Sequence, residues 1–234
     1  MNPPPPPPDW ITGAARAFAR ELRAYAGAAA GALVRPRTFG RAWAEGRSAE
    51  LNPFGFLATS AAILSGAQAI AGMQGPPHLA GQVLAALVPY VHWALLGSVA
   101  HLVLRAFGSG QPYRASLAMA LYVGGGPGLL LTLLTYAVSF GLVAATGAAS
   151  VDAAFAAHPR LSTVLFYGLV GAQVTYLALA LAGAHRARPR LAVAGVLLAL
   201  VETAVVYGVA RPPGSVGVHL ALLWLDRPRF VFRF

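Results

Sequence analysis

RAFGSGQPYRASLAMALYVGGGPG, residues 105–128, lies between two long apolar segments of the chain. It begins with a short polar turn between Arg105 and Arg114 and continues as an apolar run. The run ends in the Gly/Pro cluster 124–128. Because the segments on both sides are too apolar for a soluble domain, we interpret the turn as lying at a membrane surface between two spanning helices.

The composition independently predicts a membrane protein. Apolar residues make up 57% of the 234 residues and charged residues only 10%, outside the range of ordinary soluble domains. We therefore expect an all-α fold, a polytopic helical membrane protein with about five transmembrane helices, because helices satisfy their backbone hydrogen bonds internally. The chain has no Cys, which excludes disulfides, thiolate metal sites and Cys nucleophiles.

The charge predicts a lipid partner. The net charge is +10, and every basic residue is an arginine. These arginines lie mainly at the ends of apolar segments, where they orient helices and meet anionic headgroups, so we expect anionic membrane lipids as partners and no nucleic acid. The absence of Lys, with abundant Ala, Gly, Arg and Pro, is typical of a GC-rich bacterial genome. We therefore expect the bacterial inner membrane.

Changes in composition divide the chain into four regions. These are a polyproline tail (1–8), a cytoplasmic amphipathic and basic region (9–50), a five-span membrane domain (51–210) and an interfacial C-terminal tail (211–234).

The region after the polyproline tail predicts an amphipathic helix that starts at Asp9. Apolar residues recur at alternating spacings of four and three, while Arg16, Arg20 and Arg23 lie mostly on other parts of the helix surface. One interpretation places this helix in the headgroup plane, with its arginines on anionic phosphates. The alternative is that it packs on the cytoplasmic ends of the other helices.

Five apolar segments are candidate spans. They cover about 54–73, 79–104, 128–143, 161–184 and 191–210. The apolar stretch 115–148 would reach about 51 Å as one helix, more than a hydrocarbon core of about 30 Å. We therefore expect an interfacial or partly inserted segment at 114–122 and a helix break, with a kink, at the Gly/Pro cluster before the third span. The predicted break comprises Gly124, Gly125, Gly126, Pro127 and Gly128.

The arginine distribution predicts the orientation. With the N terminus in the cytoplasm, five spans leave twelve arginines inside and five outside. Four of those five belong to the 211–234 tail. Two alternatives therefore stay open, a tail that re-enters the membrane and a topology with six crossings.

Polar residues inside the spans are the candidate functional residues. An acidic Glu202 in the fifth span is costly unless it is paired, protonated or in contact with water, and His92 in the second span is its candidate partner. Gln68, Gln173 and Tyr122 are possible polar lining. This pattern fits either a protonatable pair on a translocation path or a structural hydrogen bond between helices, and both interpretations stay open.

Signatures of enzyme chemistry are missing from the sequence. There is no P-loop, GxSxG elbow, strand-linked dinucleotide fingerprint or HExxH spacing. We therefore expect no enzymatic activity, no cofactor, no metal and no catalytic residue.

The 105–128 segment and its surroundings resemble the Yip family of Rab-interacting membrane proteins. The similarity includes a basic RPRTF, an NPF before the first span, and FGSGQPYRASLAMALYVGGGP between the second and third spans. The residues of the loop and following helix that fit this pattern are Gly108, Gly110, Tyr113, Arg114, Leu117, Tyr122 and Pro127. The polyproline start and the basic C-terminal tail are not part of that pattern.

This resemblance implies a non-enzymatic integral membrane protein that organises membranes or acts as a trafficking-type adaptor, binding lipids or protein partners, or associating with itself. Two further hypotheses stay open. One is a small transporter or channel that uses the Glu202 and His92 pair. The other is an accessory subunit of a larger membrane complex.

Overall fold

The computed structural model describes residues 9–47, 52–70 and 79–209, and this part of the chain is helical with no strand. The fold is therefore all-α, as expected. The helices are α1 (Asp9–Val34), α2 (Pro36–Ala44), α3 (Pro53–Ile70), α4 (Leu79–Ala106), α5 (Tyr113–Val123), a π-helical segment (Gly124–Gly128), α6 (Leu129–Thr146), α7 (Val151–Ala157), α8 (Pro159–Ala184) and α9 (Pro189–Val209).

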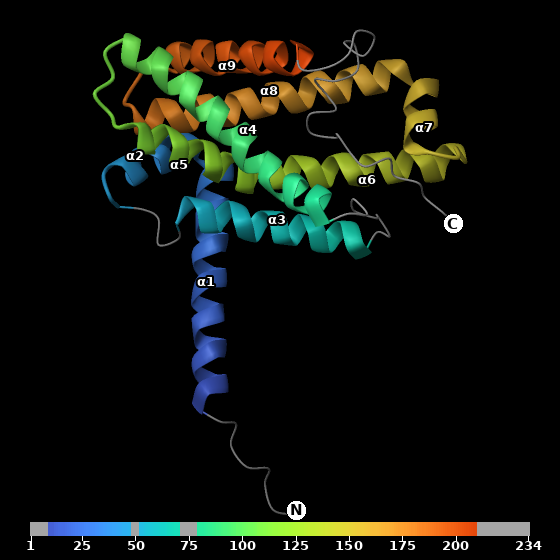
Figure 1. Cartoon of the computed structure of the whole chain (residues 1–234), viewed down its shortest axis with the longest axis horizontal. Coiled ribbons are helices and arrows are strands. Elements are labelled where there is room, and N and C mark those ends of the chain that lie inside the picture. The colour runs from blue at the N-terminus through green and yellow to red at the C-terminus, as the bar shows by residue number, and fades with distance from the viewer. Residues whose placement is uncertain (1–8, 48–51, 71–78, 210–234) are drawn as a thin grey trace, which may run out of the picture.

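Helices occupy all five segments that the sequence marks as candidate spans. α3, α4, α6, α8 and α9 run between the same two ends of the protein and alternate in direction (Figure 1). Among the described residues, two helical stretches are long and apolar enough to cross a membrane, Tyr113–Thr146 and Pro159–Ala184. The first of these combines α5, the π-helical segment and α6.

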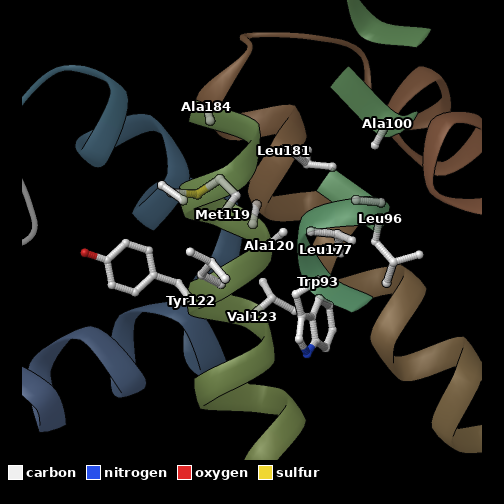
Figure 2. Close-up of a cluster of buried hydrophobic side chains, with 14 of the residues drawn as sticks. Trp93, Leu96, Ala100, Met119, Ala120, Tyr122, Val123, Leu177, Leu181 and Ala184 are labelled. Atoms are coloured by element: carbon white, nitrogen blue, oxygen red, sulfur yellow. The ribbon is translucent and has the colours of Figure 1, made fainter. Parts of the chain in front are cut away.

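α5 covers 114–122, the segment expected to be interfacial or partly inserted; it is buried among other helices of the protein, and its depth in a membrane stays a prediction. From Ala115 to Val123, every side chain except Leu117 is buried. Figure 2 shows this helix meeting Trp93 and Leu96 of α4 and Leu177 of α8. Apolar side chains along nearly the whole circumference of α5 explain this placement, because such a helix is stabilised by neighbours on every side.

At the predicted helix break the α-helix gives way to a π-helical segment, so the backbone stays helical through the Gly/Pro cluster and does not end there. Val123, Gly124, Gly128 and Leu129 all have right-handed helical dihedral angles. Proline inside an α-helix removes one hydrogen bond and its ring collides with an earlier carbonyl. The wider turn of the π-helix accommodates Pro127 without ending the helix.

The glycines of this segment allow close contact with several helices at once. A Cβ placed on Gly124 would collide with the Trp93 indole of α4, and one on Gly125 would collide with Phe56 of α3. Gly126 faces Ala29 and Ala32 of α1 at ordinary contact distance. The cluster therefore serves packing.

α6 continues from this segment with a polar row on its protein-facing side. Thr132, Thr135, Tyr136 and Ser139 are buried, and their spacing places them on one face. The three hydroxyls of Thr132, Thr135 and Ser139 donate to backbone carbonyls one turn earlier in the helix. The other faces of α6 carry exposed apolar side chains such as Leu134 and Val138.

α2 packs along the C-terminal half of α8 through glycines. A Cβ on Gly40 would collide with the Ala180 carbonyl, and one on Gly183 would collide with the Arg37 carbonyl. Phe39 of the same short helix is buried and meets Tyr122 edge to face, with ring centroids 5.1 Å apart. The basic region between α1 and α3 therefore contains a docked helix.

α1 contacts the other helices through its C-terminal half. Tyr25 stacks on Phe56 of α3 at a centroid distance of 4.7 Å and shares a 3.0 Å hydrogen bond with Ser60. Ala28 and Ala32 are buried. The N-terminal half extends away from the other helices and crosses their direction (Figure 1).

Candidate polar site between the 107–112 loop and α8

A buried cluster of polar side chains lies at the end of the protein where α4 ends, α5 begins and α8 ends. His101 belongs to the last turns of α4, Ser116 to the first turns of α5, and His185 directly follows α8. Ser109 lies in the 107–112 loop that joins α4 to α5. The loop is short, so it holds the end of α4 close to the start of α5.

Hydrogen bonds join the four side chains into one chain. Ser109 Oγ lies 2.6 Å from His185 Nδ1, and His185 Nε2 lies 2.7 Å from Ser116 Oγ. Ser116 Oγ in turn lies 3.1 Å from Nδ1 of His101. The imidazole rings of the two histidines are 5.7 Å apart between centroids. We call these four residues the histidine–serine chain.

The histidine–serine chain is satisfied in either direction. In one arrangement His101 Nδ1–H donates to Ser116, Ser116 donates to His185 Nε2, and His185 Nδ1–H donates to Ser109. In the other arrangement Ser109 donates first and every bond is reversed. Because a neutral histidine carries one donor and one acceptor nitrogen, both arrangements use neutral rings.

The histidine–serine chain lies in an enclosed and positively charged environment. Ser116 is 0% exposed, and His101 and His185 are each 6% exposed. Arg105 lies one turn after His101 on α4 and acts on it electrostatically. Burial lowers the pKa of His185 to about 4, and the neighbouring His101 adds to the decrease. His185 is therefore neutral in the folded protein at neutral pH.

Tyr113 connects this site to α4 from the start of α5. Its ring meets the His101 ring edge to face at 5.6 Å. Its hydroxyl lies 2.8 Å from Ser98 Oγ, which donates to the Ala94 carbonyl.

A cavity of about 400 Å³ opens beside the same loop. Its lining residues are Trp43, Ala44, Gly46, Gln111, Pro112, Arg114 and Ala115. Gln111 N–H donates to Ser109 Oγ at 3.4 Å, so the cavity wall and the histidine–serine chain share the loop. Glu45, near the end of α2, pairs with Arg47 and with Arg186 at 3.2 Å. The Arg47 guanidinium holds the pKa of the Glu45 carboxyl below its usual range.

The arrangement is suited to holding or moving a proton. Ser116 is fully enclosed, so it can pass a proton between the two imidazoles but cannot reach a substrate. In the described part of the chain, no group of three or more His, Asp or Glu side chains could hold a metal ion.

The polar residues predicted inside the spans have separate neighbours. Gln68 of α3 donates to the hydroxyl of Tyr136 at 2.8 Å. Tyr122 lies between Phe39 and Phe56 and has Trp43 as a hydrogen-bonding partner. Gln173 is buried on α8.

The predicted pair of Glu202 and His92 is described only in part. His92 is buried on α4 next to Trp93. Glu202 belongs to α9, but its side chain lies outside the described residues. α4 and α9 pack in opposite directions, with Gly195 against Ala100 (Figure 1). Position 202 is seven residues after Gly195, and Trp93 is seven residues before Ala100, so this antiparallel register brings position 202 level with Trp93. The pairing of Glu202 with His92 stays a prediction.

The predicted loop and lipid-facing residues are exposed. Arg105, Gly108, Gly110 and Arg114 lie on the surface, and Gly108 has a positive φ of 88° that favours glycine. Arg16, Arg20 and Arg23 are exposed on α1. Residues 1–8 and 210–234, with the polyproline tail and the C-terminal tail, lie outside the described residues.

Sequence reasoning missed the histidine–serine chain. His101 and His185 are far apart in sequence, and His185 looks like part of a basic turn. The available signal was that each histidine ends an apolar segment on the same predicted side of the membrane, where Ser109 and Ser116 also lie. Comparisons of this chain with protein-family models, with curated proteins and with solved structures found no match.

Proposed function

We propose that this chain is a five-span integral membrane protein, with a cytoplasmic N terminus, that organises the bacterial inner membrane without enzymatic chemistry. In this proposal α3, α4, the α5–α6 stretch, α8 and α9 cross the bilayer. α1 lies in the headgroup plane and binds anionic lipids, while the ends of α2 and α5 meet protein partners or a second copy. The resemblance to the Yip family agrees with this role.

The observation that carries the proposal is the direction of α1. If the long apolar helices lie along the membrane normal, a helix that crosses them lies along the membrane surface (Figure 1). Its contacts with Phe56 and Ser60 are in the first turns of α3, which is the depth of an interface.

The side chains of α1 support this orientation. Phe18, Leu22, Tyr25 and Ala29 follow one another at spacings of four, three and four, so they share one face. Tyr25 and Ala29 meet other helices, whereas Phe18 and Leu22 continue the same face beyond them and are 70% and 53% exposed. Acyl chains are the natural cover for this extension.

Charge on the remaining surface of α1 identifies the lipid class. Arg16, Arg20 and Arg23 lie mostly off the face that carries Phe18, and all three are exposed. An arginine close to an anionic membrane surface contributes about 1 kcal/mol of binding free energy. Three of them favour anionic over zwitterionic headgroups.

The test uses nitroxide labels on the full-length protein in lipid nanodiscs. The chain has no native Cys, so Leu22→Cys and Gly13→Cys each give one labelling site. The two positions are half a turn out of phase on a helix. In anionic discs we expect the label at position 22 to be accessible to oxygen, and the label at 13 to a water-soluble nickel chelate.

The control replaces Arg16, Arg20 and Arg23 together by Gln. This variant is expected to shift the label at position 22 towards water in anionic discs and to change nothing in zwitterionic discs. Equal aqueous accessibility at positions 13 and 22 of the parent protein would refute the surface orientation of α1.

A further inference from the structure

We propose that Ser109, His185, Ser116 and His101 form a proton-sensitive latch that holds the 107–112 loop against the end of α8 and releases it in mild acid. The latch goes beyond lipid binding by α1, since it acts through other side chains of the protein. Opening of the latch changes the wall of the cavity beside Arg114.

The loop depends on Ser109 for its contact with α8. Ser109 is the loop side chain that reaches His185, at 2.6 Å, and it also accepts the Gln111 N–H. Gln111 and Pro112 form part of the cavity wall next to Arg114. When Ser109 leaves His185, that wall is free to move.

Protonation weakens the closed latch through charge. A proton on either imidazole would place a positive charge in a nearly enclosed site, 5.7 Å from the second ring. Arg105 on α4 and Arg186 beyond α8 add positive charge, and Tyr113 of α5 contributes an uncharged ring. Among the described residues, no carboxylate is paired with either imidazole, and the nearby Glu45 is already bound to Arg186 and Arg47.

The pH window follows from the two states of His185. In the open state an exposed histidine has an ordinary pKa of about 6.5. In the closed state burial lowers the pKa of His185 to about 4. The closed state is therefore fully favoured above the open-state pKa, and its advantage is lost progressively as the pH falls towards the closed-state pKa. Between about pH 7.5 and about pH 5.5 the opening constant should rise about tenfold.

The test measures the distance between the loop and the turn after α8 in the full-length protein in nanodiscs. Gly110→Cys and Arg188→Cys introduce labelling sites in the loop and in that turn, and a Cβ at Gly110 meets nothing within 4 Å. Nitroxide labels at these sites report the spin–spin distance by pulsed electron spin resonance. We expect one narrow distance at about pH 7.5 and a growing second, broader population down to about pH 5.

Three variants separate the latch from other sources of pH dependence. His185→Gln removes the titrating group and should abolish the pH dependence. His158→Gln is the matched control, because His158 bonds to the Ala154 carbonyl and is not part of the histidine–serine chain. This variant should leave the pH dependence unchanged. Ser109→Ala, at a half-buried surface position, should give the broad population already at neutral pH.

Two results would overturn the latch. One is a distance distribution in the parent protein that does not change with pH. The other is an unchanged pH dependence in His185→Gln, which would assign the titration to another group. If His185→Gln does not fold, the Ser109→Ala result decides, because a narrow neutral-pH distance in that variant contradicts the latch.

Discussion

Gly124, Gly125 and Gly126 each face a different helix. The first meets Trp93 of α4, the second meets Phe56 and Ser60 of α3, and the third faces α1. A single turn thus packs against three neighbouring helices. At Gly124 and Gly125 the neighbours are so close that only glycine fits. The absent side chains let the backbones approach closely, an arrangement also found between membrane helices.

Gly124→Ala tests this packing. A methyl group at this position would displace the buried Trp93 indole, and overpacking of this kind costs about 1–3 kcal/mol of unfolding free energy. We expect a clear decrease in the thermal unfolding midpoint of the detergent-solubilised protein. Gly126→Ala is the matched control, since its nearest neighbours are 3.7 Å away. It should leave the midpoint unchanged or raise it, and equal losses in both variants would contradict the packing role.

The sequence correctly predicted an irregular helical segment at the Gly/Pro cluster, but the helix continues through it. Glycines and proline in an apolar helix predict a break from local propensity alone. The neighbours of Gly124 and Gly125 come from α4 and α3, which are distant in sequence, so local reasoning could not identify them. The ring of Tyr122, a residue predicted as possible polar lining, lies between Phe39 and Phe56, and the lining role stays a prediction.

α2 and α8 pack closely because each supplies a glycine. Gly40 allows α2 to approach the Ala180 carbonyl, and Gly183 allows α8 to approach the Arg37 carbonyl. Since α2 has only nine residues, its helical structure depends on this contact more than on its own propensity.

Gly183→Ala should therefore loosen α2. The added methyl group meets backbone atoms that cannot rotate away, so the two helices must separate. We expect faster amide hydrogen exchange in residues 36–44. Gly171→Ala, on the same helix with nothing within 4 Å of its Cβ, should leave that exchange at the parent rate. Unchanged exchange in Gly183→Ala would show that α2 is held by other contacts.

Helix positions were predictable because apolar length and flanking arginines are local signals. α3, α4, α6, α8 and α9 begin and end close to the predicted limits. The burial of α5 among other helices was not predictable in this way. Its sequence is short and flanked by a polar loop, which suggests a surface, and only the surrounding helices place it in the centre.

The alternating directions of the long helices lead to a prediction of sidedness for the protein in its membrane. With five crossings, a cysteine at Gly46 or Gly110 should lie on the cytoplasmic side, and one at Gly75 or Ala149 on the other side. Labelling of each single-Cys variant in intact cells with a membrane-impermeant maleimide reads this out. We expect labelling at positions 75 and 149 only.

Labelling at position 75 distinguishes five crossings from two. If only Tyr113–Thr146 and Pro159–Ala184 crossed the membrane, positions 46, 75 and 110 would share one side. Protection of position 75 together with labelling of 149 would therefore contradict the spanning of α3 and α4.

The histidine–serine chain shows where sequence reasoning ends for the candidate site. Its four members come from α4, the 107–112 loop, α5 and the end of α8, and no spacing in the sequence relates them. The loop itself was predictable as a polar turn between two arginines. That Ser109 reaches a histidine 76 positions away depends on tertiary packing.

The π-helical segment also sets the phase of the helix that follows it. A residue added to an α-helix rotates everything beyond it by about 100°. That rotation brings Thr132, Thr135, Tyr136 and Ser139 to the inner face while α5 keeps its own contacts with α4 and α8. If this segment were regular α-helix with the same number of residues, the hydroxyl row would be turned by about 100° away from its present neighbours. The wider turn of this segment therefore positions α6 as well as accommodating Pro127.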